Sequence, residues 1–456
     1  MAISTFSPRD HRRNRSGFVL DYIFFNVGLT FAGINTTLPA FAARLTTDPL
    51  LIGLVGAVWM GGWLLPQMFA ARYLSTAPRK MPFILFFSWI GRPVFLLFAL
   101  YLFLSGAVWP GATLLLLYLA SFYFSFTDSI TGVAWFDLLG KALSNRERGR
   151  FIGLGQAAAG ILSIGAGIII RWVLESSGLG FPNNYALILV LADVFFLLSL
   201  AAIYLVREPL EKVATERQKM TDYLPGLVQL IRQDRMFRRV NVARLLIGLC
   251  GLASPFFAVY AIRVLAMPEG DVGWFAIAQT IGLAIAGLVL GTLAERRGSV
   301  SVVRLVGGIY LAAPIFVLAA GVPGLNQTLS TVLMAAAFLM LGMGDGSIML
   351  GFLNYVLDIA PPEKRPVYVG LTNTLAGATV LYPFLGGALV DGVGYRIVFA
   401  LAAAGIAAGW VVGASLPAAA APPVVCDPPQ PGATNPQVRP NAGETPPGKG
   451  THWEGD

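Results

Sequence analysis

The segment at residues 153–160 reads GLGQAAAG, and the segment at residues 370–377, 217 positions later, reads GLTNTLAG. Asp128 and Asp345 stand at the same separation, and an arginine follows each of them by 20 residues. Matches of Leu, Ala and Gly arise easily in an apolar chain, whereas matched Asp and Arg at a constant offset do not. An internal repeat in such a chain indicates a transporter built from two similar halves, with chance composition as the alternative.

The composition is that of a membrane protein. The mean hydropathy is +0.70, 56% of residues are hydrophobic and 12% are charged, against roughly a quarter charged in soluble domains. A transmembrane helix needs ~20 apolar residues. Twelve stretches qualify: 17–40, 51–73, 81–104, 112–138, 151–173, 184–206, 240–263, 272–293, 301–321, 330–355, 369–390 and 396–416. The alternation of a membrane β-barrel is absent, so we expect an all-α protein with twelve transmembrane helices.

Lysine and arginine indicate the orientation. An even number of helices puts both termini on one side, and assigning that side as cytoplasmic places 27 of the 32 basic residues inside. Only four lie in outer segments: Arg44, Arg171, Arg263 and Arg396. The net charge of +8 therefore needs no nucleic-acid partner. Residues 1–16 are interpreted as a basic cytoplasmic flank and not as a cleavable signal peptide.

The expected domains follow from this count. Six helices (17–206) form one bundle, a charged cytoplasmic linker spans 207–239, and six more helices (240–416) form the second bundle. Residues 417–456 contain ten prolines, and we expect this cytoplasmic tail to be disordered. Because each half has six helices, both enter the membrane in the same direction. Their repeat axis must then run along the membrane normal, giving two pseudo-symmetric bundles.

One loop carries a specific resemblance. After the eighth stretch the chain reads GTLAERRG from Gly291 to Gly298. This resembles the signature loop of the major facilitator superfamily, G-x-L-x-D-R-x-G, with Glu295 in place of the usual Asp and without the basic residues that usually follow. The resemblance implies that Glu295, Arg296 and Arg297 hold neighbouring helices together at the inner face and favour the outward-open state. The alternative is that these arginines merely anchor the loop inside.

Two related motifs match less well. The corresponding loop after the second stretch, STAPRK at 75–80, keeps Arg79 and Lys80 but lacks the acid and both glycines. Proton antiporters of the superfamily often carry Gly-Pro-x-x-Gly-Gly in the fifth helix. Here residues 160–167 read GILSIGAG, without proline, so this motif does not support antiport.

Four polar residues are candidates for substrate binding or proton coupling. In the superfamily, helices one, four, seven and ten line the central cavity, which implies that Asp21, Asn26, Asp128 and Asp345 face it. A charge at mid-membrane costs ~3 kcal/mol, so it requires a partner, a wet cavity or a function. An aspartate in a cavity that alternates between wet and dry states binds and releases protons within a cycle. The alternative is a fixed Asp–Arg pair that only holds helices in place.

Other residues of the expected helices complete the candidate site. Arg92 lies near the middle of the third stretch and needs a partner, for which Asp128 and Asp193 are the candidates in its own half. The alternative hypothesis is that Arg92 takes part in transport. The resemblance also suggests aromatic cavity walls from Phe122, Phe126, Phe256, Phe257 and Tyr260.

The sequence predicts no enzyme, no metal site and no cofactor. There is no phosphate-binding loop with its lysine, and the two histidines, His11 and His452, lie in the tails. Two cysteines make no disulfide framework. We expect a monomeric secondary transporter that moves a small organic solute, with or without protons, by alternating access. The rivals are an exporter or flippase of amphipathic lipidic compounds and a non-transporting sensor or assembly protein. Abundant Arg, Ala and Gly suggest a bacterial cytoplasmic membrane.

Overall fold

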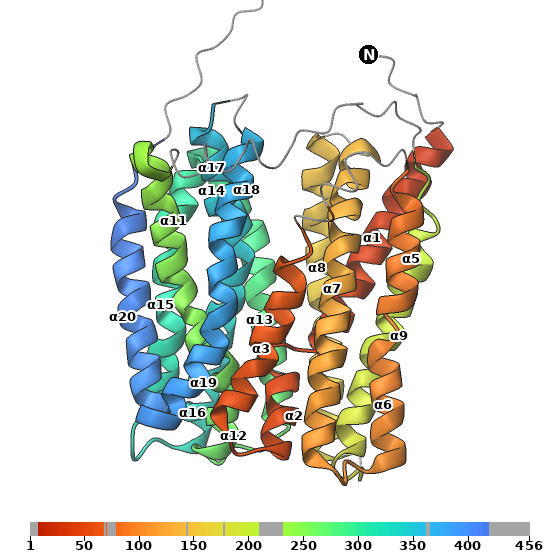
Figure 1. Cartoon of the computed structure of the whole chain (residues 1–456), viewed down its shortest axis with the longest axis vertical. Coiled ribbons are helices and arrows are strands. Elements are labelled where there is room, and N and C mark those ends of the chain that lie inside the picture. Colours follow the sequence, from red (N-terminus) through yellow and green to blue (C-terminus); the bar gives the residue numbers. More distant parts are fainter. Residues whose placement is uncertain are drawn as a thin grey trace, which may run out of the picture. The chain divides into compact units, whose positions relative to one another are not determined.

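The computed structural model describes residues 8–67, 70, 79–142, 145–176, 178–208, 231–361 and 365–418. The secondary structure of this part of the chain is entirely helical (Figure 1). Residues 1–419 form one compact unit. Most of the predicted linker and nearly all of the predicted disordered tail lie outside the described residues, so both remain predictions.

The N-terminal half contains eight described helices. They are α1 (Pro8–Phe31), α2 (Thr37–Leu45), α3 (Pro49–Leu64), α5 (Met81–Gly91), α6 (Val94–Ser105), α7 (Pro110–Ala142), α8 (Asn145–Glu175) and α9 (Asn183–Ile203). Two expected stretches are interrupted. The first breaks between α1 and α2, and the third breaks at Arg92-Pro93, because proline has no N–H to continue the helical ladder.

The C-terminal half repeats this plan with more local irregularity. Its elements are α11 (Arg235–Ile247), η2 (Gly248–Leu252), η3 (Ser254–Phe256), α12 (Phe257–Arg263), α13 (Asp271–Ile285), η4 (Ala286–Leu290), α14 (Gly291–Arg297), α15 (Ser299–Ala320), α16 (Gln327–Ile348), η5 (Met349–Leu353), α17 (Asn354–Ile359), α18 (Arg365–Ala376), η7 (Gly377–Leu381), α19 (Tyr382–Val393) and α20 (Tyr395–Ala414). The elements η4 and η5 are short π-helical segments, which often occur at functional sites.

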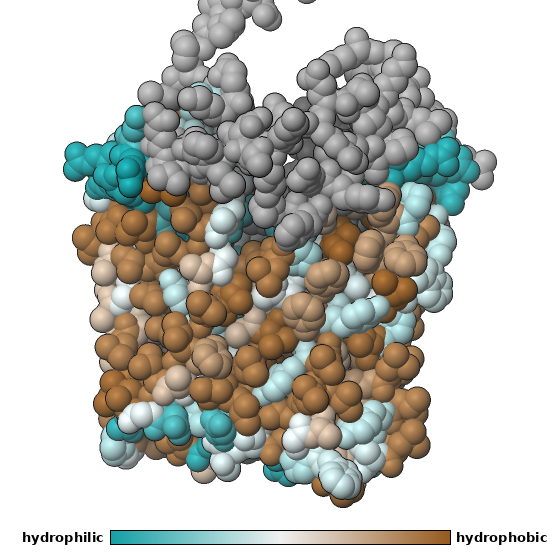
Figure 2. Space-filling model, in the orientation of Figure 1, coloured by the Kyte–Doolittle hydropathy of each residue, from teal (hydrophilic) through white to brown (hydrophobic). Residues whose placement is uncertain are grey.

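Ten helical segments in the described residues are long and apolar enough to cross a membrane. The first two expected spans differ from these. α3 is apolar but has only 16 residues, and α1 begins with the charged sequence PRDHRRNR. The expected count of twelve therefore stays a prediction. Figure 2 shows a broad apolar surface with hydrophilic residues near its ends, the distribution expected of a chain surrounded by lipid.

The two halves meet along two pairs of helices, α8 with α13 and α3 with α19. Glycines allow the backbones to approach. A side chain on Gly167 of α8 would collide with the backbone of Gly273 on α13, and a side chain on Gly53 of α3 would collide with the carbonyl of Pro383 on α19. Small residues at such crossings replace the hydrophobic drive that is missing between helices in lipid. These contacts position the site between the halves.

Candidate functional site

A cavity of about 610 Å³ lies between the two halves. Residues of α1, α3, α7 and α8 line it on one side, and residues of α13 and α16 line it on the other. The charged lining residues are Asp21, Arg92, Asp128 and Asp345. Other polar lining residues include Asn26, Thr30, Thr131, Gln156, Gln279 and Thr280. All five residues predicted for substrate or proton coupling thus lie on one cavity, although their roles stay predictions.

Asp21 of α1 is the partner of Arg92. Its Oδ1 lies 3.5 Å from Nη2 of Arg92 and accepts a 2.5 Å hydrogen bond from Ser199, while its Oδ2 accepts one of 2.7 Å from the indole of Trp135. Arg92 also donates to the carbonyl of Phe196 at 3.0 Å. Both charged side chains are almost completely buried. The sequence interpretation, which favoured Asp128 or Asp193 as the partner, was wrong on this point.

Asp193 of α9 does not pair with Arg92 but contacts the start of α6, after the break at Pro93. Its Oδ2 accepts a hydrogen bond of 3.1 Å from the backbone N–H of Leu96, in the first turn of α6. Because α6 begins directly after Pro93, this turn has free N–H groups that no carbonyl in the helix can reach. A carboxylate there satisfies one of them and matches the positive end of the helix dipole. The observed contact of Asp193 is therefore structural.

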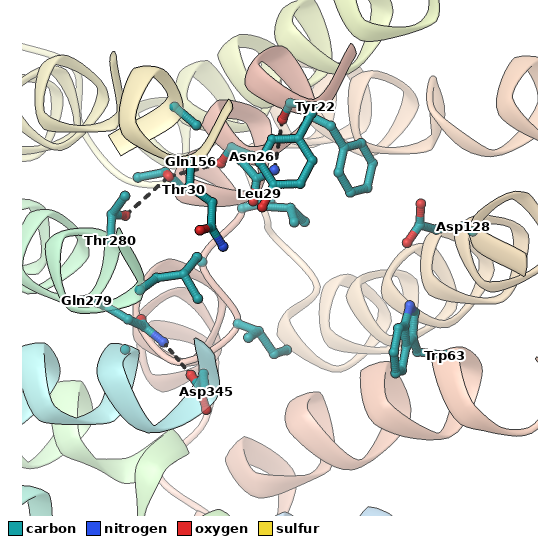
Figure 3. A pocket seen from close by; sticks show the side chains of 18 of the residues that line it. Tyr22, Asn26, Leu29, Thr30, Trp63, Asp128, Gln156, Gln279, Thr280 and Asp345 are labelled. Atoms are coloured by element: carbon teal, nitrogen blue, oxygen red, sulfur yellow. Dashed lines mark hydrogen bonds between the residues drawn. The ribbon is translucent and has the colours of Figure 1, made fainter. Parts of the chain in front are cut away.

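Asp128 and Asp345 face each other across the cavity from opposite halves (Figure 3). Asp345 of α16 accepts hydrogen bonds from the hydroxyl of Tyr310 at 2.8 Å and from the amide of Gln279 at 3.2 Å, and it is exposed to the cavity. Asp128 of α7 is half-buried, and the indole nitrogen of Trp63 points toward it (Figure 3). No ion pair involves either carboxylate within the described residues.

Hydroxyl groups also connect the halves along the cavity wall. Thr30 of α1 donates to Ser163 of α8 at 2.9 Å, and its hydroxyl lies 3.5 Å from that of Thr280 on α13. Asn26, a predicted site residue, donates to the carbonyl of Tyr22 one turn earlier at 2.8 Å. Its amide is thus turned back on its own helix, and Thr30 makes the contact between halves that the sequence interpretation missed.

Charged contacts join the two halves at the face where α2 and α12 lie, the lower end in Figure 1. Nη1 of Arg44, at the end of α2, lies 2.7 Å from Oε1 of Glu269, which precedes α13. Arg263, at the end of α12, donates to the carbonyls of Ala43 and Thr46 and, at 3.3 Å, to that of Thr47. Each contact joins the N-terminal to the C-terminal half.

A third arginine contributes to the same face. Arg171 of α8 forms ion pairs with Glu175 in its own helix at 3.1 Å and with Asp271 of α13 at 3.6 Å. The fourth arginine predicted to lie outside, Arg396, instead donates to the carbonyl of Gly321 within its own half. From the sequence, these four residues were interpreted only as exceptions to the positive-inside rule. Three of them connect the two halves.

The predicted signature loop lies at the opposite end of the helices. It comprises α14 and Gly298, whose φ of +78° is a left-handed conformation that favours glycine. Glu295, Arg296 and Arg297 are exposed and make no ion pair with any residue in the described ranges. The predicted role of these side chains in holding neighbouring helices together therefore stays a prediction.

The matching loop of the N-terminal half is only partly described. Arg79 is exposed and Lys80 is buried, with Nζ of Lys80 lying 3.9 Å from Asp137 of α7. Glu208, which follows α9, accepts hydrogen bonds from the backbone N–H groups of Lys80 at 2.6 Å and Met81 at 2.9 Å. This carboxylate caps the start of α5, a role that sequence analysis did not foresee.

The aromatic wall differs from the expected one. The aromatic residues that line the cavity are Tyr22, Phe25, Trp59, Trp63, Trp135 and Phe136. Phe256, Phe257 and Tyr260 are instead fully buried. Phe257 and Tyr260 pack against Phe399, and Phe256 packs against Tyr395. None of the five predicted aromatic residues lines the cavity, because sequence alone does not show toward which side of its helix each ring points.

Two helical halves surround a shared polar cavity, and one loop of the C-terminal half resembles a known signature. A sequence model of the Major Facilitator Superfamily matches residues 20–377 and 251–449. The chain belongs to the major facilitator superfamily. It is therefore a multi-pass membrane protein of a transporter family.

Curated relatives in this superfamily match over short segments. The chain is 28% identical over 127 residues to the "Uncharacterized MFS-type transporter Rv1250" of Mycobacterium tuberculosis, covering 28% of this chain and 21% of that protein. It is 31% identical over 130 residues to the "Efflux pump aflT" of Aspergillus parasiticus, covering 28% of this chain and 24% of that protein. The chain thus matches less than a quarter of the length of either relative.

Solved structures match the fold over most of the chain. A bacterial homologue of the iron transporter ferroportin in an inward-facing state superposes with a TM-score of 0.63 at 16% identity, over 88% of this chain and 98% of that one. A structure of such a homologue in an outward-facing state gives 0.57, also at 16% identity, over the same shares. At these identities the likeness concerns the fold alone.

Proposed function

We propose that the protein is a secondary transporter that moves a small organic solute across a bacterial cytoplasmic membrane by alternating access. The observation that supports this best is the cavity between the halves, with Asp128 and Asp345 on opposite walls. Carboxylates at membrane depth are costly unless they serve a ligand, an ion or a wet pathway. A protein of this superfamily with such a cavity has the parts that alternating access requires, and it needs no covalent chemistry.

The state represented here is inward-open in this proposal. Arg44, Arg263 and Arg171 join the halves at the face of α2 and α12, which becomes the outer face if the termini are cytoplasmic. The signature loop agrees with this assignment, because its Glu295 has no ionic partner among the described residues. Twelve spans with both termini inside complete the proposed topology.

Proton coupling is assigned to Asp128 and substrate contact to Asp345. Asp21 is unsuited to carry protons, because Arg92, Ser199 and Trp135 already satisfy its carboxylate. Asp128 is half-buried beside hydroxyl-bearing neighbours on α7, including Thr131 of the cavity lining. Asp345 is exposed to the cavity and is held by two neutral donors, Tyr310 and Gln279, so its charge is available to a ligand.

The function is tested by ligand-induced thermal stabilisation of the purified protein across a library of small solutes. Hits are then assayed for uptake into proteoliposomes. We expect at least one solute to stabilise the wild type, to stabilise Asp345→Asn less, and to be taken up. If labelled lipids move between leaflets and no soluble solute does, the flippase reading replaces this one. If solutes bind and nothing moves, the protein is a sensor.

A further inference from the structure

The lining of the cavity is unbalanced in charge. Among the described residues, the charged side chains of the lining are three carboxylates, Asp21, Asp128 and Asp345, and one guanidinium, that of Arg92. Arg92 is committed to Asp21 at 3.5 Å. Asp345 is left without a cationic partner among the described lining residues, while Asp128 on the opposite wall interacts electrostatically with Arg92 without forming an ion pair with it. A solute that carries a negative charge would meet like charges here, which costs free energy.

The side chains around Asp345 also leave its negative charge unneutralised. Its two hydrogen-bond donors, Tyr310 and Gln279, are neutral. Arg244 of α11, a basic residue of the same half, does not line the cavity. The side of the Asp345 carboxylate that faces the cavity can therefore bind one positively charged group of a ligand. A cationic ligand there offsets the cost of holding the charge at membrane depth.

The opposite wall suits the body of such a ligand. Trp59 and Trp63 of α3 line the cavity, and Trp63 is 39% exposed, so its ring is open to a solute. Aromatic faces attract cations, tryptophan most strongly. The protein already uses this interaction nearby, because the guanidinium of Arg92 lies 5.5 Å from the ring centre of Phe25.

The size of the cavity and the arrangement of its side chains favour an organic cation over a metal ion as the ligand. About 610 Å³ is within the usual range for drug-sized ligands. Metal ions need several oxygen, nitrogen or sulfur ligands around one point. The described residues contain no group of three or more His, Cys, Asp or Glu side chains that meets this need, and Asp128 and Asp345 lie on separate walls.

We propose that the substrate is an amphipathic organic cation, with its positive group at Asp345 and its apolar body against the tryptophans of α3. This proposal rests on the transport function inferred above. It specifies the substrate class, which that function leaves open. Neutral solutes lack the charge contact, and anionic solutes are repelled.

A matched pair of probes tests the sign of the charge. Tetraphenylphosphonium and tetraphenylborate have nearly the same shape and opposite charges. We expect tetraphenylphosphonium to bind the full-length purified protein saturably and tetraphenylborate not to. Asp345→Asn should weaken binding of the cation roughly tenfold, and Asp345→Glu should restore most of it. Asp391→Asn, at an exposed position of α19 outside the cavity, is the matched control and should bind as the wild type does.

The aromatic contact has its own variants. Trp63→Ala should weaken binding of tetraphenylphosphonium more than Trp63→Phe, because phenylalanine keeps a ring face. Equal binding of tetraphenylborate, or unchanged affinity in Asp345→Asn, overturns the proposal. Proteoliposome counterflow separates this failure from failure of the transport function. If a neutral or anionic solute moves and the cation does not, only the substrate class is wrong. If no solute of any charge moves, both proposals fall.

Discussion

Arg44 and Glu269, 225 residues apart in sequence, form an ion pair of 2.7 Å between the two halves of the protein. Arg263 reinforces it by donating to three carbonyls at residues 43–47 of the opposite half. Since Arg44 is about half exposed, the pair itself contributes little to overall stability. Its importance lies in its position, because opening this face requires the halves to give up these contacts.

The first prediction concerns this face. Arg263→Ala removes charged hydrogen bonds that exist only when the face is closed, at a cost of about 2 kcal/mol. The population open at this face should rise roughly thirtyfold. The measurement is outside labelling of Ala276→Cys, a cavity residue, by a membrane-impermeant reagent, in a background with Cys250→Ala and Cys426→Ala. Arg396→Ala is the control, because Arg396 bonds within its own half, and its labelling should match the parent protein.

The second prediction concerns the buried pair of Asp21 and Arg92. Arg92→Ala leaves the Asp21 carboxylate buried without its cation, which should destabilise the fold by ~3–5 kcal/mol. Adding Asp21→Asn removes the unpaired charge and should restore much of the expression level and thermal stability. Combining Arg92→Ala with Asp193→Asn should bring no recovery, since Asp193 is bonded to Leu96. Rescue by Asp193→Asn and not by Asp21→Asn would show that the pairing described here is wrong.

The third prediction concerns proton coupling. Asp128→Asn cannot bind and release a proton, so solute transport driven by a pH gradient should be lost. Exchange of labelled for unlabelled solute, which needs no gradient, should continue at about the wild-type rate. Uptake by proteoliposomes with and without an imposed gradient measures both. Gradient-driven transport at the wild-type level in Asp128→Asn would leave this residue a structural role only.

The fourth prediction concerns the signature loop. Glu295 and Arg296 are exposed in this state without an ionic partner among the described residues. Glu295→Ala should therefore leave the thermal stability of this state unchanged while lowering transport, if the loop engages its partners only when the outer face opens. Cysteine accessibility at the outer face should fall. Full transport with unchanged accessibility would make the loop a simple anchor.

Much of the fold could be predicted because its physical causes are local. Long apolar stretches predicted where the helices lie, and Pro93 marks the break between α5 and α6. The cost of charge in a membrane pointed to Asp21, Arg92, Asp128 and Asp345, which share one cavity. The 217-residue repeat pointed to the two halves that surround it.

Pairings and orientations could not be predicted. Arg92 contacts Asp21, whose helix is distant in sequence and whose rotation about its own axis no apolar pattern specifies. Trp63 belongs to the cavity wall because of how α3 crosses between the halves. The roles of Arg44 and Arg263 depend on which loops meet across the two halves. One usable signal was overlooked: Gln156 and Gln279 are amides within apolar helices, and both line the cavity.

Alternating access is tested most directly by locking the closed face reversibly. Cys250→Ala and Cys426→Ala first remove the native thiols. Arg44→Cys and Glu269→Cys then place two thiols where the ion pair lies, and a short reducible bifunctional reagent cross-links them. Solute counterflow into proteoliposomes should stop after cross-linking and return after reduction, while either single-cysteine protein treated in the same way keeps its activity. Undiminished counterflow in the fully cross-linked protein would contradict the account, because the solute would then cross without this face opening.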